Sequence, residues 1–246
     1  MSNDLHEHET HGGHDSGHHE PPEVVDGRQR MSIWLFIGGD MVGLSALLFT
    51  YLYLRGVNTG GHWMSMWGYQ GHSYAWYENA LNSSAGLPAP TLIHVKPMSP
   101  SYSWLVTAVT VVSAAIVWIA ERGLRASKNA KAFATTSLVA TIVVIVAAVM
   151  SVIQLRHLPE IFQAHNDSQI MGYTAYSSAM MALIGSALVH LIIVAFLGIG
   201  LFLRGLRGVI NGENWYQARL VRMFWVWVAV SAVIVSALTT TVNTIH

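Results

Sequence analysis

Five apolar runs of about 20 residues each constrain the fold of this chain more than any other feature of its sequence. A helix of 22 residues, the length of the first run, is roughly 33 Å long and crosses the hydrocarbon core of a bilayer. The fourth run is long enough that it must tilt or project from the membrane. Of all residues, 52% are hydrophobic and 11% are charged, whereas about 25% are charged in soluble domains. We therefore predict an all-α integral membrane protein with five transmembrane helices, over about residues 33–54, 102–120, 132–155, 173–203 and 223–245.

The basic residues are distributed unequally between the two sides of the predicted membrane domain. Three of the 13 Lys and Arg residues, Arg55, Lys96 and Arg156, lie on one side. Cytoplasmic segments of membrane proteins carry the excess of Lys and Arg. We therefore predict a cytoplasmic N-terminus and a C-terminus on the outer, periplasmic side. The ten basic residues of the cytoplasmic side are Arg28, Arg30, Arg122, Arg125, Lys128, Lys131, Arg204, Arg207, Arg219 and Arg222.

The first 30 residues are of low complexity and rich in histidine, glycine and acidic residues. Such a segment cannot bury enough apolar surface to order itself, so we predict a disordered cytoplasmic tail. The alternative is weak binding of Zn²⁺, Cu²⁺ or Ni²⁺, because neutral imidazoles are ligands for all three ions. The histidines concerned are His6, His8, His11, His14, His18 and His19.

Residues 56–100 form a long polar connection that is dense in aromatic residues and contains four prolines. Trp and Tyr prefer the membrane–water interface, and their density argues against a flexible linker. We predict an ordered outer loop that rests at the interface; a surface for a partner protein is the alternative. Its Trp and Tyr residues are Trp63, Trp67, Tyr69, Tyr74, Trp76 and Tyr77.

Asp40 is the one acidic residue inside the first apolar run, ten positions after Arg30. It lies roughly 15 Å along the helix from that arginine. A carboxylate at this depth is costly and usually faces protein rather than lipid. Gly39 and Gly43 lie nearby, and small residues let a second helix approach closely. We therefore predict that Asp40 lies in a helix–helix contact, with Gly39, Gly43 and, in the fourth run, Gly185 as packing residues.

His190 is the other residue well inside the runs that can exchange a proton near neutral pH. It lies roughly 21 Å from the basic end of its helix, so both groups fall in the central part of the membrane. A hydrogen bond between Asp40 and His190 would lower the cost of burying each of them. The alternative is that backbone or hydroxyl groups satisfy the two residues separately.

The sequence lacks the residues that most catalytic and redox centres need. It has no cysteine, which excludes disulfides, iron–sulfur clusters and thiolate metal sites. A bis-histidine haem, copper or non-haem iron needs two or more inward ligands, but only one histidine lies inside the runs. There is no glycine-rich phosphate loop. The formal net charge of zero gives no sign of a basic surface that would bind nucleic acid. We predict no catalytic residue, cofactor or metal site within the membrane domain.

Several short motifs, taken in order, resemble subunit III of the haem–copper terminal oxidases. The segment from Trp34 to Asp40 reads Trp-Leu-Phe-Ile-Gly-Gly-Asp and is similar to the family's Trp-Leu-Phe-(Ile/Leu)-x-Ser-Glu. Residues 51–55 match Tyr-x-x-Leu-Arg, and Gln154 matches the Gln that precedes x-x-Glu-Tyr. Residues 176–190 follow the spacing of Tyr-Gly-Ser…Leu-Thr-Gly-Phe-His-Gly-Leu-His. The resemblance covers about residues 31–245 and is to the short, five-helix members of the family.

The chain also departs from the family pattern at several of these positions. Asp40 stands where the family has Glu, one methylene longer, and Ala187 replaces the first histidine of the paired motif. His157 replaces the Glu that follows Gln154. Residues 221–226 replace Tyr-Trp-His-Phe-Val-Asp near the last helix. The first two helices of the seven-helix members, which hold phospholipid in a cleft, are absent.

The resemblance implies a non-catalytic subunit III of a respiratory oxidase in the bacterial inner membrane. Its partners would be subunits I and II, which hold the haems and coppers, reduce O₂ to water and translocate protons. Asp40 and His190 would support subunit I and its proton uptake, and Trp34 and Gln154 would be further motif residues. Bound phospholipid is implied as well, in a cleft that other subunits would complete because the two family helices are missing. The electron donor, cytochrome c or quinol, would bind outside this chain.

A second hypothesis is a small membrane transporter or a metal-handling permease supplied by the histidine-rich tail. Such a protein needs several ionisable groups along a pathway, or broken helices near the middle of the membrane. The sequence shows little of either, so we favour the oxidase subunit.

Overall fold

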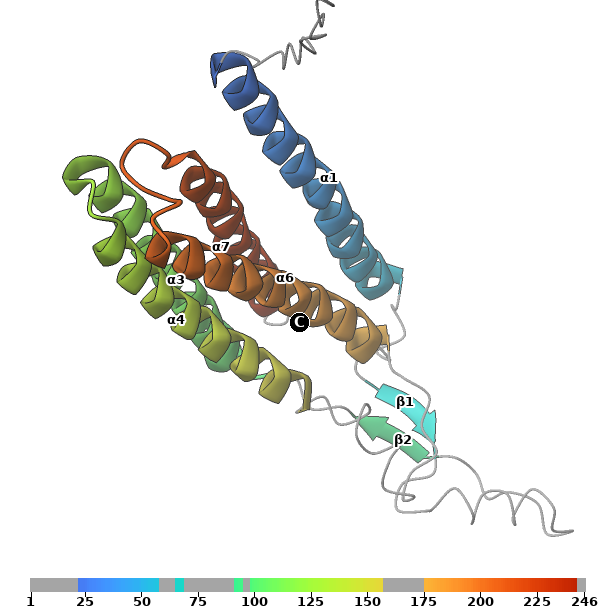
Figure 1. The fold of residues 1–246 in the computed structure, drawn as a ribbon. Coiled ribbons are helices and arrows are strands. Elements are labelled where there is room, and N and C mark those ends of the chain that lie inside the picture. Colours follow the sequence, from blue (N-terminus) through green and yellow to red (C-terminus); the bar gives the residue numbers. More distant parts are fainter. Residues whose placement is uncertain (1–21, 58–64, 69–90, 95–97, 157–174, 243–246) are drawn as a thin grey trace, which may run out of the picture.

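In a computed structural model of the chain, residues 22–57, 65–68, 91–94, 98–156 and 175–242 are described (Figure 1). They form five long helices and a two-stranded ribbon. In chain order the elements are α1 (Pro22–Val57), β1 (Ser65–Gly68), β2 (Thr91–His94), α3 (Pro100–Ser127), α4 (Ala130–Arg156), α6 (Ala175–Leu206) and α7 (Tyr216–Val242).

All five helices are long and apolar enough to cross a membrane, which confirms the prediction of five such segments. Each helix extends beyond at least one end of its apolar run. Helix α3, for example, continues through seven residues past Ala120 to Ser127, because the polar residues that follow the run are also good helix formers. A left-handed residue, Lys128, then ends the helix, and its backbone N–H bonds back to the carbonyl of Leu124.

Helix α1 begins at Pro22, so residues 22–30 of the predicted disordered tail are helical instead. Proline is well tolerated at the first position of a helix, because its missing N–H would have no partner there. The remaining part of the predicted tail, residues 1–21 with all six histidines, lies outside the described residues.

The predicted outer loop contains a short antiparallel ribbon that an all-α prediction did not include. Strand β1 pairs with β2, with Ser65 opposite His94 and Gly68 opposite Thr91. The other residues of the loop between α1 and Met98 (58–64, 69–90 and 95–97) lie outside the described part of the chain.

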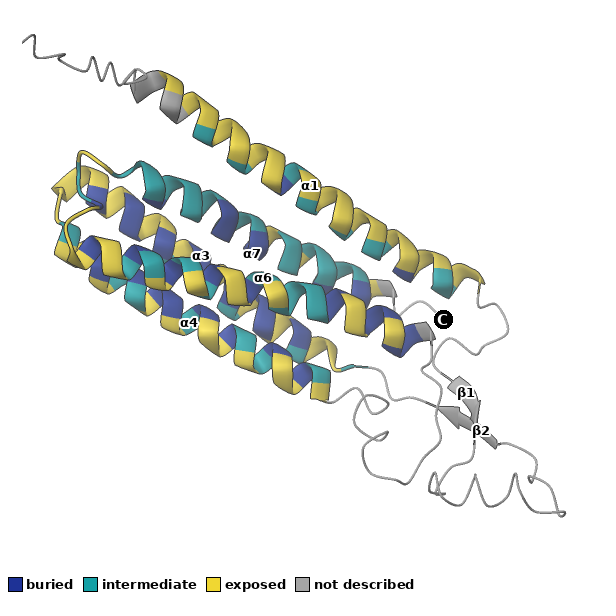
Figure 2. Ribbon diagram, turned by 45° about the vertical axis from the view of Figure 1, so that its right-hand side comes forward, coloured by how far each residue is buried: buried dark blue, intermediate teal, exposed yellow. Residues whose placement is uncertain are grey.

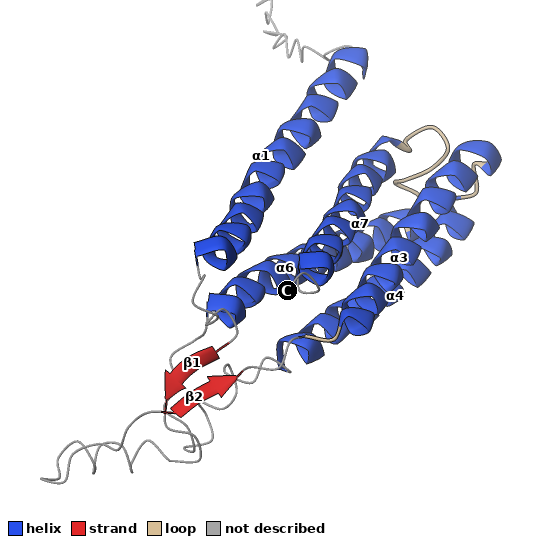
Figure 3. Cartoon of the chain, turned by 180° about the vertical axis from the view of Figure 1, so that it is seen from behind, coloured by secondary structure: helices blue, strands red, loops and turns tan. Residues whose placement is uncertain are grey.

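Helices α3, α4, α6 and α7 form a closed ring in which each helix packs against two neighbours (Figure 3). Small residues let these helices approach closely. On α4, Ala134, Ala140 and Ala147 are fully buried. On α6, a Cβ added to Gly198 would collide with the side chains of Thr141 on α4 and Trp225 on α7. The core of the ring is therefore set by small residues facing a few large ones.

Helix α1 lies outside this ring, against α6 and α7 (Figure 1). In the apolar stretch of α1 only 6% of residues are buried, compared with 44% in α3. Figure 2 shows the difference as a helix that is exposed along most of its length. The contacts that it does make involve the buried residues Ile37 and Tyr51. Large apolar surfaces of this kind are covered by lipid or by a partner protein.

Candidate functional site

Asp40 lies on the side of α1 that faces α6, where it meets His190. The His190 Nε2 atom is 2.7 Å from Asp40 Oδ1, and His190 Nδ1 is 2.7 Å from the carbonyl oxygen of Ser186. Of the two arrangements that the sequence left open, the hydrogen bond between the first and fourth membrane helices is therefore the one present. The two side chains are 21% and 17% exposed, so both are largely shielded.

Trp227 on α7 completes this contact by donating its indole N–H to Asp40 Oδ2. Each carboxylate oxygen of Asp40 therefore has a partner on a different helix, and Asp40 joins α1 to both α6 and α7. Trp227 was not among the predicted site residues, because tryptophan in an apolar run is usually counted as hydrophobic. A signal was available: a buried carboxylate has two oxygens, and His190 can satisfy only one of them.

The hydrogen-bond partners of His190 fix how many protons the pair holds. The carbonyl of Ser186 can only accept, so Nδ1 must carry a hydrogen. The bond between Nε2 and Asp40 then needs one further proton, which lies either on Nε2 or on the carboxyl group. In the first case the pair is an imidazolium and a carboxylate, and in the second both groups are neutral. The pair has no net charge in either case, which reduces the cost of burying it.

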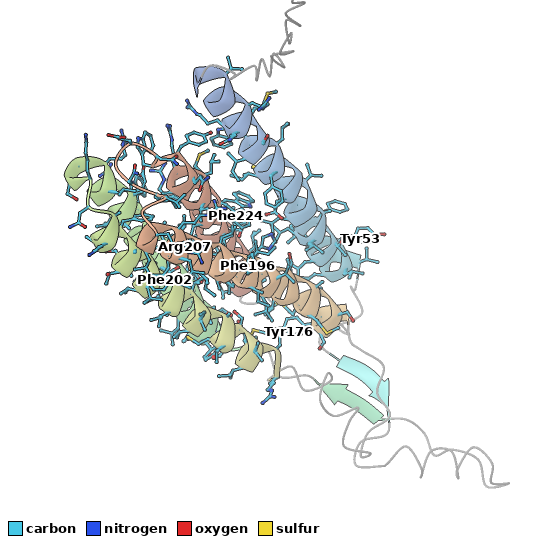
Figure 4. All side chains as sticks on the ribbon, viewed as in Figure 1. Tyr53, Tyr176, Phe196, Phe202, Arg207 and Phe224 are labelled. Atoms are coloured by element: carbon cyan, nitrogen blue, oxygen red, sulfur yellow. The ribbon has the colours of Figure 1, made fainter. Side chains whose placement is uncertain are left out.

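Aromatic rings from α1 and α7 pack beside the Asp40–His190 contact. Phe36 meets Phe224 edge to face, with ring centroids 5.3 Å apart, and the His190 ring lies 6.2 Å from that of Phe224. In Figure 4 side chains fill the space between α1, α6 and α7, with Phe224 labelled there. These apolar neighbours lower the local polarity, which strengthens the hydrogen bonds to Asp40.

A second polar cluster lies where α3 and α7 reach the basic end of the bundle. Glu121 is 1% exposed, and its carboxylate is 3.0 Å from Arg222 Nη1 and 3.7 Å from Arg125 Nη1. The guanidinium groups of Arg122 and Arg222 lie over the ring of Trp118, at 5.3 and 5.6 Å from its centroid. A cation is attracted to the face of an aromatic ring, so Trp118 helps to hold both arginines in place.

Glu121 was not predicted to have a role, because it lies at the boundary of the second apolar run. The helical spacing contained the missing signal. Positions that recur every three or four residues face one side of a helix, and Glu121 continues such a series of buried residues along α3. The series is Ser103, Thr107, Thr110, Ala114, Val117 and Glu121.

The two remaining motif residues lie in different surroundings. Gln154 on α4 is 5% exposed. Its amide nitrogen is 2.7 Å from Ser103 Oγ and 2.7 Å from Met98 Sδ. Trp34 on α1 is 61% exposed and contributes to the wall of a groove beside α7. Neither residue contacts the Asp40–His190 pair through a described hydrogen bond.

The predicted packing glycines make no close contacts with the described part of the chain. A Cβ added to Gly39, Gly43 or Gly185 would meet no atom within 4 Å. Asp40 faces α6 and α7, but Gly39 and Gly43 are exposed, so the helix that we expected beside them is not supplied by the chain itself. Their packing against another protein stays a prediction. The close approaches between helices occur instead at Gly198 and at Gly205.

Within the described residues, no three His, Asp or Glu side chains come close enough together to hold a metal ion. The histidines of the first 20 residues lie outside that part of the chain, so their metal binding stays a prediction. What the described polar groups can do is hold one proton at Asp40–His190 and tie helices together at both clusters.

No protein-family model matches the chain, and no curated protein is significantly similar to it. A functional interpretation therefore depends on the sequence motifs and on the geometry described above.

Proposed function

We propose that this chain is a non-catalytic subunit III of a respiratory haem–copper oxidase in a bacterial inner membrane. One observation carries the proposal. Asp40 and His190 belong to two motif-like segments 150 positions apart, and their side chains are hydrogen-bonded at 2.7 Å. Each segment resembles the family on its own, and the contact between them in the fold supports the proposal.

In this role the chain supports subunit I, while subunits I and II hold the haems and coppers. The exposed face of α1 offers a large apolar surface to a partner within the membrane. The Asp40–His190 pair, which holds a single shared proton, is suited to influence proton uptake by that partner. If the pair gives up this proton, an uncompensated charge remains in a shielded place until a second proton replaces the first.

The proposed orientation places the Glu121 cluster and the start of α1 at the cytoplasmic surface. In the described part of the chain, Arg28, Arg30, Arg122, Arg125 and Arg222 all lie at this end of the bundle. Segments rich in Lys and Arg are retained in the cytoplasm during insertion. The short β1–β2 ribbon would then lie on the periplasmic side.

Phospholipid, which the sequence resemblance implies, has a suitable place between α1, α3 and α7. A hollow of about 390 Å³ there is bounded by Arg30, Arg219 and Arg222, and by apolar and Trp side chains. A second hollow, of about 410 Å³ and wholly apolar, shares Trp118 with it. Arginines at one end and apolar walls at the other match the charge and shape of an anionic lipid.

Purification of the chain from its native membrane tests the proposed function. A tag placed after residue 246 leaves the described helices intact. Mass spectrometry of the purified material should identify haem–copper oxidase subunits in stoichiometric amount, together with haem absorption, whereas the isolated chain should be colourless. Recovery of the chain without any haem–copper subunit, from membranes that contain an active oxidase, would contradict the proposal.

The same preparation tests the lipid site. Native mass spectrometry should show bound anionic phospholipid, and replacement of Arg30 and Arg219 by Gln should reduce it. Gln replacement of Arg156, which lies at the opposite end of the bundle, is the matched control.

A further inference from the structure

A small cavity lies inside the ring of helices α3, α4, α6 and α7, apart from the Asp40–His190 site. Its volume is about 50 Å³. Half of its lining residues carry a hydroxyl or amide group, which is unusual for the interior of so apolar a bundle. These polar residues are Ser103, Thr107, Thr110, Ser151, Gln154, Ser231, Ser236 and Thr239.

Hydrogen bonds across this cavity link three of the four helices. Gln154 Nε2 on α4 donates to Ser103 Oγ on α3 at 2.7 Å. Thr107 Oγ1 on α3 and Ser236 Oγ on α7 are also 2.7 Å apart. Part of the polar lining is thus connected between helices, whereas four hydroxyls bond to carbonyls of their own helix, those of Thr110, Ser151, Ser231 and Thr239.

The lining still has capacity to accept hydrogen bonds. A hydroxyl group has one hydrogen to donate and two lone pairs to accept with. The hydroxyls of Thr110 and Ser151 donate their hydrogens to the carbonyls of Val106 and Ala147, at 2.9 and 3.0 Å. The lone pairs of these two hydroxyls remain available to accept hydrogen bonds. Within the described part of the chain, no group donates to the amide oxygen of Gln154.

The size and chemistry of the cavity select its occupant. A water molecule needs about 10–15 Å³ of such volume and two to four polar partners, and the hydroxyl and amide groups of the lining supply such partners. The cavity is too small for an acyl chain, and no ionised side chain lines it to balance an ion. We propose that it binds a cluster of roughly three water molecules, held by Gln154, Ser103, Thr107 and Ser236.

Met180 provides a direct probe of these waters. It lines the cavity although it is 2% exposed to the outside. X-ray radiolysis converts water in place to hydroxyl radicals, which oxidise a neighbouring methionine sulfur. Met180 in the intact chain should therefore be oxidised readily in spite of its burial. The measurement is its oxidation rate by tandem mass spectrometry, with the neighbouring Met181, on the outer surface of α6, as an internal reference.

Ala232→Val removes space from the cavity, since Ala232 is one of its lining residues. This variant should lower the oxidation rate of Met180 several-fold and leave that of Met181 unchanged. Ala237→Val, the same change on the same helix at a position that does not line the cavity, should leave both rates unchanged. If Ala232→Val does not fold, Ala187→Val fills the cavity from α6 instead. A Met180 that resists oxidation, or whose rate is the same in the filled variant, would overturn the proposal.

Discussion

The guanidinium group of Arg222 lies 3.0 Å from the carboxylate of Glu121, which is 1% exposed, although 101 positions separate the two residues in the chain. The pair joins α3 to α7 at the basic end of the bundle. A buried carboxylate of this kind depends on its partner, because the cost of removing it from water is recovered only through that contact.

We therefore expect Arg222→Met to destabilise the chain strongly. The variant leaves Glu121 with Arg125 alone among the described cations, at 3.7 Å. Loss of one member of a buried ion pair costs about 3–5 kcal/mol. The double variant Glu121→Leu/Arg222→Met removes both charges and should recover much of the loss. Thermal unfolding in detergent, followed by tryptophan fluorescence, measures both effects; equal stability of Arg222→Met and the unchanged chain would show that the pair contributes little.

Two glycines of α6 should respond in opposite ways to the same substitution. Gly198→Ala places a Cβ against Thr141 and Trp225, and such overpacking costs about 1–3 kcal/mol. Gly200→Ala meets no atom within 4 Å, and there alanine should stabilise the helix by up to about 1 kcal/mol. Thermal unfolding of the two variants gives the comparison. A Gly198→Ala chain as stable as Gly200→Ala would mean that α4 and α6 are not packed this closely.

The five helices long and apolar enough to cross a membrane could be predicted from the sequence because length and hydropathy are local properties. The ends of the helices could not, since Pro22 to Arg30 is too polar to belong to an apolar run yet continues α1. The position of α1 outside the ring was also beyond prediction. Hydropathy marks a helix as membrane-spanning but does not say which helices will be its neighbours.

The candidate site was predictable in part for the same reason. Asp40 and His190 could be matched because their depth follows from counting residues along two helices. Trp227 could not be matched in this way, because α7 carries other aromatic residues and depth alone does not distinguish Trp227 from them. For Gly39 and Gly43 the spacing predicted a helix-packing face, but spacing does not reveal whether the described part of the chain covers that face, and it does not.

Labelling of single cysteines tests the proposed orientation, and the chain is suited to it because it has no cysteine of its own. Ser99 immediately precedes α3 and Ser127 is its last residue, and both are exposed. In intact cells a membrane-impermeant thiol reagent should label a cysteine at position 99 and not one at 127. Both should react after the cells are opened. The reverse pattern in intact cells would place the basic end of the bundle outside and contradict the positive-inside assignment.

The last prediction separates the proton of Asp40 from its hydrogen bonds. In Asp40→Asn the side-chain amide can donate to Nε2 of a neutral His190, while its oxygen still accepts from Trp227. Every hydrogen bond of the site is then kept, but the shared proton is gone. In Asp40→Leu both His190 and Trp227 lose their hydrogen-bond partner, at a cost of about 1–3 kcal/mol for each unsatisfied group. We expect Asp40→Leu to loosen α1 and reduce retention of the chain in the purified oxidase, whereas Asp40→Asn should assemble normally.

Oxygen consumption then decides what the proton does. If the pair influences proton uptake, the Asp40→Asn complex should contain the chain in full amount yet turn over more slowly or inactivate sooner. If Asp40 serves only to hold α1 against α6 and α7, the Asn variant should have unchanged turnover. Val42→Leu, on the exposed face of the same helix, controls for substitution in α1 and should match the unchanged chain in both measurements. Full retention and full turnover in Asp40→Leu would show that the contact with His190 and Trp227 serves neither purpose, because that variant lacks both the proton and the hydrogen bonds.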